Sequence, residues 1–501
     1  MNRRNLRSVT RLLAQLPGAV WLSLTLSQRK YHLFVVAVVL YLATNPLLAP
    51  GLISSLDVVP TTLLPVSIIR ERDFDLDEFL DHPVAREHDW ERANWLVKID
   101  DHYFSGYPVF TALLVTPLYL LPVVLGLGPQ SSLVAYTLLG KTGGALLAAA
   151  SVVLVYLSLR LAASELTALC LSVVYAFASS TWTISSQILW QHATSQLLLA
   201  AGIYCLIRSQ GEAKTYALSG LFIGLAVAAR PPTAIVAVVL TVYVLHRSRG
   251  RFPHFVAGAL GSLAFLLWYN HSTFGSPIAQ GYEAEAWAGW TTPLLIGLVG
   301  LLLSPSRGLL VYSPVFWFSI AGIAASWTKG LRDNPHIWLF RYLGVAVAGF
   351  TFLMSKWHSP GGWCFGPRML VDVAPLLTLL MIPAFKWLGR GRIVLVAFGV
   401  LLAISIAVQL AGLTMFDFSR YRQLPAARYE QPAFWSIRHS ELAFYLDRFG
   451  VGGFLGRILG QAAVSATLAL FVTGASLYLL RRRGLLEQHG EETEHLREKP
   501  V

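Results

Sequence analysis

The sequence has few charged residues: Asp, Glu, Lys and Arg make up 13% of its 501 residues, whereas 55% are hydrophobic. A soluble domain carries about twice that share of charge, so the composition excludes an ordinary water-soluble enzyme. Cysteine is also scarce, and the scattered positions of Cys170, Cys205 and Cys364 indicate neither a disulfide framework nor a zinc site. The apolar segments lack the alternation of strands, which argues against a β-barrel.

Long apolar runs are what the sequence has instead. There are about thirteen, and many reach the roughly 20 residues that a spanning helix needs. The sequence therefore predicts an all-α, polytopic transmembrane helical bundle with about 12–13 spans. The runs cover residues 31–52, 107–127, 133–159, 166–182, 188–207, 216–229, 233–245, 255–269, 309–327, 337–354, 369–388, 393–415 and 458–480.

The positive charges cluster at the ends of these runs, for example at Arg247, Arg249 and Arg251, and the net charge is +12. This is the positive-inside pattern, and it indicates cytoplasmic segments rather than a nucleic-acid partner. We expect a basic cytoplasmic N-terminus (1–30) that leads into an uncleaved anchor, a transmembrane domain (31–480) and a charged cytoplasmic tail (481–501).

Two cytoplasmic ends require an even number of crossings. Either the short run at 291–303 or one half of the pair broken at Pro231-Pro232 is then expected to be re-entrant. The same alternation places 53–106, 357–368 and 416–456 outside, together with 274–292 and 304–308.

The first outside loop (53–106) is rich in acids, and Asp57 lies just beyond the first apolar run. An ionisable residue where the chain leaves the membrane is a functional candidate. The alternative is that Asp57 only caps a helix that starts at Val58, with Pro60 in its first turn. The apolar stretch 61–69 is too short to cross and is predicted to be a juxtamembrane helix.

Several loops carry motifs that are more than connectors: Ser105-Gly106-Tyr107-Pro108, residues 188–192 (Ile-Leu-Trp-Gln-His), residues 304–308 (Ser-Pro-Ser-Arg-Gly) and the Gly/Pro-rich segment 357–368. With these motifs and its layout, the sequence resembles the GT-C class of polytopic glycosyltransferases. It is most similar to bacterial relatives of the protein O-mannosyltransferases and of the lipid A aminoarabinose transferases.

The resemblance implies transfer of a sugar from a polyprenyl-phosphate carrier to an acceptor on the outer face, with an outside carboxylate as catalytic base. Asp57 occupies the matching position. Many relatives have an Asp-Glu pair there, whereas this chain has Asp57-Val58, so four other acids remain rivals: Asp75, Asp77, Asp100 and Asp101.

Such a reaction also needs cations for the leaving phosphate, and arginine can pair with phosphate oxygens through two bonds. Arg368 and Arg307 are the main candidates, with His192 and Lys356 as further donor phosphate-binding residues. Three alternatives remain open: Arg368 could form an ion pair with Asp372 one helical turn on, Arg307 could be an interfacial anchor, and His192 could be a buried hydrogen-bonding group.

For the acceptor or the sugar, the outside loops offer aromatic and acidic side chains. The alternatives are an interfacial aromatic belt and a solvated loop. The candidates are Trp363, Trp357, Tyr282, Glu283, Asp100 and Asp101.

The sequence thus predicts a multi-pass membrane glycosyltransferase, a hexosyl- or pentosyltransferase of the bacterial inner membrane and cell envelope with its active site facing outward. Expected partners are a polyprenyl-phosphate-linked sugar, a glycan, lipid or protein acceptor, and membrane lipid. No cofactor and no metal ligands are expected, although a divalent metal stays possible. The alternatives are a lipid or glycan transporter or flippase, and a GT-C-like ligase of whole glycans. Transporters usually place acids within their spans, and nearly all acids of this chain lie in loops.

Overall fold

The computed structural model describes residues 25–44, 56–87, 90, 95–279, 281, 289–362, 364–389, 391–417 and 428–497. The described part is mostly helical, which confirms the predicted all-α membrane bundle. Six of its helices are long and apolar enough to cross a membrane, and seven further apolar helices are shorter. The number of crossings therefore stays a prediction, as do the cytoplasmic assignments of 1–30 and 481–501, of which 1–24 and 498–501 lie outside the described residues.

The first half of the chain contains α2 (Leu26–Ala43), η1 (Leu56–Val58), α3 (Val59–Arg70), η2 (Asp77–Phe79), α4 (Pro83–Glu87), β1 (Leu96–Ile99), β2 (His102–Ser105), α5 (Phe110–Val124), α6 (Leu133–Ala162), α7 (Glu165–Phe177), η3 (Thr181–Ser185), α8 (Gln191–Arg208), α9 (Ala213–Ala229), η4 (Pro231–Thr233), α10 (Ala234–Arg247), η5 (Arg249–Arg251) and α11 (Phe252–Phe274). The predicted juxtamembrane stretch 61–69 is helical and forms most of α3.

The second half contains α13 (Leu294–Leu303), α14 (Leu309–Tyr312), η6 (Pro314–Phe316), α15 (Trp317–Ser326), η7 (Lys329–Leu331), α16 (Ile337–Ser355), η8 (Arg368–Val373), α17 (Ala374–Leu388), α18 (Arg392–Met415), α20 (Pro432–Trp435) and α21 (Glu441–Arg497). The run expected at 309–327 is not one helix, because Pro314 has no N–H to continue the ladder and α14 ends at Tyr312.

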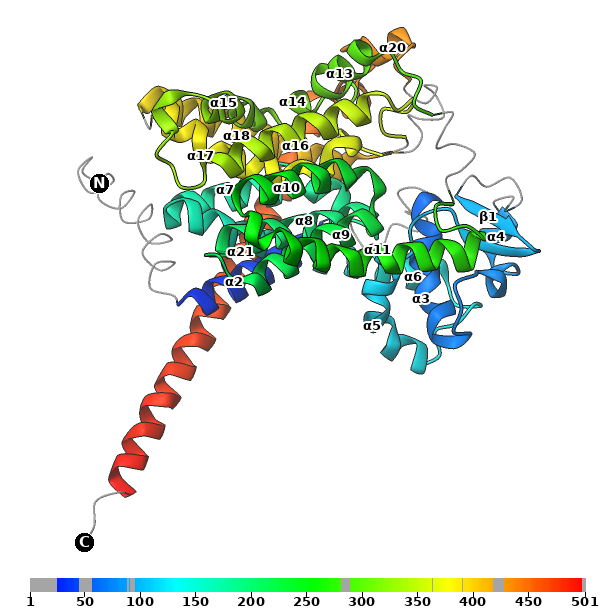
Figure 1. Ribbon diagram of the computed structural model, residues 1–501, viewed down its shortest axis with the longest axis horizontal. Helices are drawn as coiled ribbons and strands as arrows, with labels where there is room; N and C mark the ends of the chain where they lie inside the picture. The colour runs from blue at the N-terminus through cyan, green and yellow to red at the C-terminus, as the bar shows by residue number, and fades with distance from the viewer. Residues whose placement is uncertain are drawn as a thin grey trace.

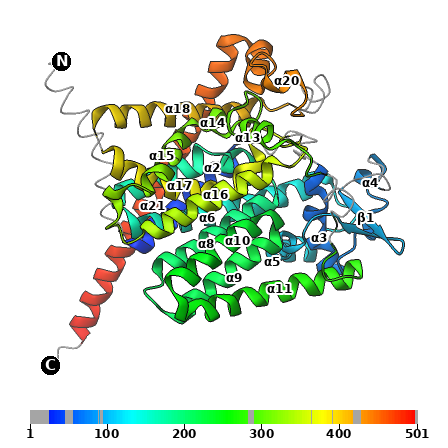
Figure 2. The same ribbon diagram turned by 45° about the horizontal axis from the view of Figure 1, so that its top comes forward.

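The helices form two layers (Figure 1), with α13 to α18 in the upper layer and α7 to α11 below them. Within the upper layer α15 packs on α17, and across the two layers α16 packs on α10. When the molecule is tilted, α8, α9, α10 and α11 are seen to run side by side (Figure 2). The segment with α3, α4 and the two strands lies at one end of the body.

A small antiparallel β-hairpin interrupts the helical pattern, which the sequence analysis did not predict. β1 pairs with β2 in the register Leu96 to Ser105 and Ile99 to His102. Its turn is made by Asp100 and Asp101, both with left-handed backbone (φ 48° and 67°). Short acidic side chains tolerate this conformation, so these two residues have a structural reason to be there.

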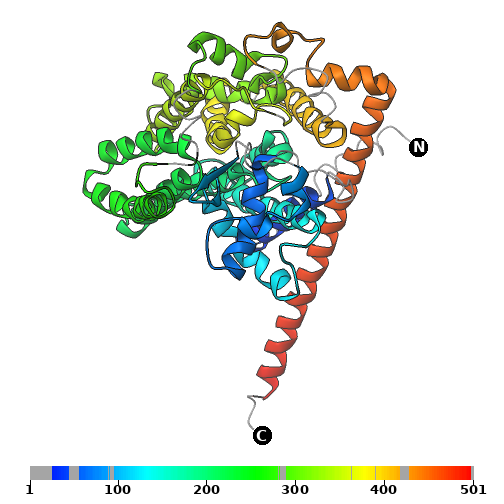
Figure 3. The ribbon, with the colours of Figure 1, turned by 90° about the vertical axis from the view of Figure 1, so that its right-hand side faces the viewer.

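The last helix begins within the segment expected as the outside loop 416–456, because α21 starts at Glu441 and continues through a kink at Gly450 (φ 64°). Figure 3 shows it running along the body and then leaving it. α21 packs on α2, and Thr473 lies 3.3 Å from the His32 ring. The start of α2 and the part of α21 before the basic tail thus lie at the same end of the molecule.

Candidate functional site

A polar pocket, whose volume of about 260 Å³ includes space open to solvent, lies where five segments that are far apart in the sequence meet. These are η1 with the start of α3, Tyr107 between β2 and α5, the start of α8, the break between α9 and α10, and η8. The lining residues are Asp57, Val58, Thr61, Tyr107, Leu189, Trp190, Gln191, His192, Arg230 and Arg368. The structure thus brings together three residues that the sequence analysis selected separately: Asp57, His192 and Arg368.

Asp57 and Arg368 form an ion pair in this pocket, with 2.8 Å between Oδ2 and Nη2. The guanidinium of Arg368 also lies over the Trp190 ring, 3.9 Å from its centroid, and its Nε donates to His192 Nε2 at 3.4 Å. Both members of the pair keep some exposure to the pocket, 25% for Asp57 and 12% for Arg368. A carboxylate and a guanidinium therefore face the same space.

Asp372 does not pair with Arg368 but with residues on two other segments. His192 Nδ1 lies 3.0 Å and 3.1 Å from its two oxygens, and Arg230 Nε donates to Oδ2 at 3.3 Å. The alternative of a bridge between Arg368 and Asp372 assumed an α-helix, in which residues four apart share a face. η8 is a 3-10 helix with three residues per turn, so Asp372 points roughly 120° away from Arg368.

Arg307 lies outside the pocket and holds the loop that leads to Arg368. It is 1% exposed, and its guanidinium donates to the carbonyls of Cys364, Gly362 (2.8 Å) and Gly366 (3.2 Å). Its Nη1 also lies 3.1 Å from Glu441 Oε1 at the start of α21. These contacts commit the arginine to the Gly-rich loop, so the geometry favours a structural role over phosphate binding.

The other predicted residues divide into two groups. Lys356 and Trp357 are described and half-buried, but neither is among the described residues that line the pocket; the Trp357 ring packs edge-on against Trp290. Asp100 and Asp101 lie in the exposed hairpin turn, where Asp101 pairs with Lys98 at 3.1 Å. Trp363, Tyr282 and Glu283 lie outside the described residues.

Three ionised side chains of this region were missed by the sequence analysis or given another role: Arg230, Asp372 and Glu441. Arg230 lies between the end of α9 and the Pro231-Pro232 break, and an arginine at an interrupted helix is a signal that could have been used. Glu441 was assigned to a loop, and no local signal links it to Arg307.

A metal could be held by one group of side chains in the described residues, Asp75, Asp77 and His102, whose ligand atoms lie within 4.8 Å of one another. His102 Nδ1 is 2.5 Å from Asp77 Oδ2, and Asp77 Oδ1 accepts the Tyr103 N–H at 2.8 Å. The hydrogen bond to Asp77, and then the charge of Asp77, raise the pKa of His102. An aspartate–histidine hydrogen bond accounts for this arrangement without a metal.

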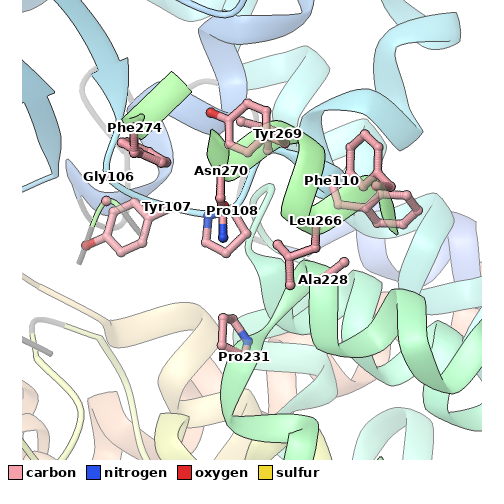
Figure 4. Close-up of a pocket in the computed structure, with 13 residues that line it drawn as sticks. Gly106, Tyr107, Pro108, Phe110, Ala228, Pro231, Leu266, Tyr269, Asn270 and Phe274 are labelled. Atoms are coloured by element: carbon pink, nitrogen blue, oxygen red, sulfur yellow. The ribbon is translucent and has the colours of Figure 1, made fainter. Parts of the chain in front are cut away.

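A second, apolar pocket adjoins the polar one, because Tyr107 lines both. It encloses about 400 Å³, part of which is open to solvent. Figure 4 shows Phe110 from α5, Leu266, Tyr269 and Asn270 from α11, and Pro231 from η4 around this space. A ligand with a charged group beside an apolar group would meet matching surfaces here.

The fold of this protein is similar to those of known proteins. Neither a family model nor a curated protein sequence matches this chain. Among solved structures, it is similar to ArnT from Cupriavidus metallidurans bound to undecaprenyl phosphate, with 16% identity, a TM-score of 0.52, and coverage of 89% of this chain and 75% of that chain. It also matches the Archaeoglobus fulgidus oligosaccharyltransferase in complex with Zn and sulfate, with 13% identity, a TM-score of 0.44, and coverage of 80% of this chain and 58% of that chain.

The protein therefore has the GT-C fold of polytopic membrane glycosyltransferases, as the sequence resemblance predicts. ArnT is a lipid A aminoarabinose transferase, and this chain matches most of its length. At this identity the likeness concerns the fold.

Proposed function

We propose that this protein is an integral-membrane glycosyltransferase that uses a polyprenyl-phosphate-linked sugar and acts on the extracytoplasmic face. The observation that carries the proposal is the pairing of Asp57 with Arg368 in one pocket of a GT-C fold. A transferase of this kind needs a base and an anion-binding group within reach of the same sugar. The apolar pocket beside them suits the first isoprenoid units of the carrier.

In the proposed reaction, Asp57 takes the proton of an acceptor hydroxyl. The hydroxyl oxygen attacks the anomeric carbon, a new glycosidic bond forms, and the bond between that carbon and the phosphate oxygen breaks. The bonding electrons leave with the polyprenyl phosphate, whose charge is stabilised by Arg368 and by nearby Arg230. Among the described contacts, Arg368 uses only Nε and one N–H of Nη2, so its fork keeps donors for the phosphate.

The proposal is tested with purified protein, short-chain polyprenyl-phosphate sugars and a panel of acceptors, by measuring both glycosylated product and released polyprenyl phosphate. Asp57→Asn keeps the size of the side chain and removes the base, and we expect the rate to fall by roughly a hundredfold to ten-thousandfold. The matched control is Asp81→Asn, an 82% exposed acid of the same loop, which should leave the rate unchanged. Full activity of folded Asp57→Asn would contradict the assignment and favour Asp100 or Asp101.

The role of Arg368 is tested by comparison with Arg307. Arg368→Lys keeps the charge and loses the planar fork, so we expect weaker use of the lipid donor, and Arg368→Ala should be weaker still. Arg307→Lys should instead lower thermal stability, because its guanidinium holds the loop carbonyls. If both lysine variants lose only stability, Arg368 has no part in donor binding.

The lipid flippase alternative gives a different result in the same assay. A flippase would move the labelled donor across a vesicle membrane and leave the bond between sugar and phosphate intact. If the donor is translocated and no acceptor of the panel leads to release of polyprenyl phosphate, the proposed transferase activity is refuted.

A further inference from the structure

The side chain of Arg368 is oriented from three directions. Asp57 holds Nη2, the Trp190 ring lies against the guanidinium, and His192 Nε2 accepts from Nε. An arginine cannot lose its proton in a protein, so Nε2 of His192 has to be the acceptor in this contact. The proton of the neutral imidazole is then on Nδ1, the nitrogen that faces Asp372.

Asp372 has no access to solvent and receives hydrogen bonds on both oxygens. Ser195 Oγ donates to Oδ1, Arg230 Nε donates to Oδ2, and His192 Nδ1 lies within 3.1 Å of both oxygens. As an acceptor-only group when ionised, this carboxylate requires an N–H at His192 Nδ1. It therefore excludes the other tautomer, whose Nε2–H would point at the Nε–H of Arg368.

We infer that Asp372 is a positioning residue: by fixing the proton of His192 on Nδ1, it keeps Nε2 as the acceptor that aims Arg368 at Asp57 and the pocket. The inference rests on the proposed function, in which Arg368 meets the donor phosphate. Asp372 itself is not among the described residues that line the pocket. It acts through His192, in the way that outer partners orient ligating histidines in metal sites.

The local fold explains why these groups meet. Trp190 lies at the start of α8 in extended backbone, so His192 falls in the first turn of that helix, and Ser195 lies one turn further on. η8 turns Asp372 toward α8 and Arg368 toward the pocket, because its residues repeat every three positions. Arg230 compensates the buried charge of Asp372 from the break between α9 and α10.

The test exchanges His192 for two amides of different length. Asparagine places its amide near the position of Nδ1, so His192→Asn keeps the contact with Asp372 and loses the one with Arg368. Glutamine reaches the position of Nε2, so His192→Gln keeps an acceptor for Arg368 and loses the contact with Asp372. A hydrogen bond to a charged group is involved, so we expect kcat/KM for the donor to fall by roughly tenfold to a hundredfold in His192→Asn and less in His192→Gln.

A double-variant comparison tests whether Asp372 acts through His192. Asp372→Asn alone should raise the donor KM, whereas in the His192→Gln background the same change should have little further effect on KM. If Asp372 only compensates the charge of Arg230, Asp372→Asn will change the donor KM equally in both backgrounds. In that case kcat/KM for the donor will be higher in His192→Asn than in His192→Gln. Either result would overturn the inference.

Two controls separate this test from stability and from the proposed function. Thermal stability is measured for every variant, and Ser195→Ala, which removes one hydrogen bond to Asp372 but leaves His192 in place, should cost less donor affinity than His192→Asn. Binding of radiolabelled polyprenyl phosphate is measured beside transfer. If the wild-type protein binds it without transferring sugar, the proposed reaction fails, while the order of the His192 variants in binding still tests the positioning role.

Discussion

At the scale of single residues, burial separates the arginine that we propose for donor binding from the arginine that holds a loop. Arg368 keeps access to the pocket, whereas Arg307 is enclosed by the carbonyls of the Gly362 to Gly366 loop and by Glu441. Glu441 also accepts the Gly366 N–H at 3.2 Å, so one carboxylate fixes both the arginine and the loop. A buried charge that loses its partner is costly, which makes this pair a stability element.

We predict that Arg307→Ala or Glu441→Ala destabilises the protein by about 3–5 kcal/mol, because each leaves the other charge buried. The measurement is thermal or denaturant unfolding in detergent. The double exchange Arg307→Met with Glu441→Leu should recover part of that loss. A single variant as stable as the wild type would contradict the structural role.

Glu78 gives a pH-dependent prediction in the first outside loop. Burial raises its pKa to about 7, so the folded protein binds this proton more tightly than the unfolded chain. Its contribution to stability is then complete below the ordinary pKa of glutamate and is lost as the pH rises toward 7. Glu78→Gln should flatten this part of the pH–stability curve and raise the melting temperature at about pH 8 relative to the wild type. An unchanged pH–stability curve would contradict the raised pKa of Glu78.

At the scale of elements, glycines set the closest helix contact. A Cβ added to Gly258 of α11 would lie 1.9 Å from the Ala217 carbonyl oxygen, and one added to Gly220 of α9 would lie 1.9 Å from the Phe255 carbonyl oxygen. The two backbones approach each other through these glycines, as in membrane helix pairs with small residues. α9 and α11 make the most extensive helix pairing of the described chain.

We predict that Gly258→Ala separates α9 from α11 and destabilises the protein by about 1–3 kcal/mol, since backbone has to move. The matched control is Gly261→Ala in the same helix, where an added Cβ meets nothing within 4 Å. That change should be neutral or slightly stabilising, because alanine is the better helix former. Equal melting temperatures for both variants would show that the close approach is not required.

The elements that carry the candidate site also divide into those that the sequence predicts and those that it does not. Asp57, His192 and Arg368 were found because each lies beside an apolar run or a Gly/Pro-rich loop. The alternative pairing of Asp372 with Arg368 was wrong, because the spacing alone does not distinguish a 3-10 helix from an α-helix. The hairpin around Asp100 and Asp101 was missed, although two short runs of β-branched and aromatic residues on either side of two turn-forming aspartates are a strand signal.

At the scale of the whole molecule, the sequence predicted the class of protein but not which residues meet in space. The scarcity of charge and the length of the apolar runs were enough to predict a polytopic helical membrane protein, and the resemblance in loop motifs and layout added the GT-C class. Arg230 with Asp372 and Arg307 with Glu441 join segments more than a hundred positions apart, and a single sequence carries no information on such pairs. The contact between Asp77 and His102 spans only 25 positions, and it was not predicted either.

The orientation in the membrane is a further prediction at this scale. In a background without Cys170, Cys205 and Cys364, single cysteines at Glu283 and Trp363 should react with an impermeant thiol reagent in intact cells, because those loops are expected outside. Gly250→Cys, in the exposed turn between Arg249 and Arg251, should react only after lysis. The opposite pattern would invert the topology and place the proposed site in the cytoplasm.

The bond between Arg307 and Glu441 also has a consequence for biosynthesis. Arg307 is synthesised long before Glu441, so during translation its charge lacks the carboxylate that pairs with it in the finished protein. The Gly-rich loop in front of Arg368 likewise gains the hydrogen bond from the Gly366 N–H to Glu441 only after the start of α21 has been made. A nascent chain that stalls before Glu441 would therefore hold an uncompensated cation and a loop with one anchor fewer, which are features by which a protease could distinguish an unfinished chain from a complete one.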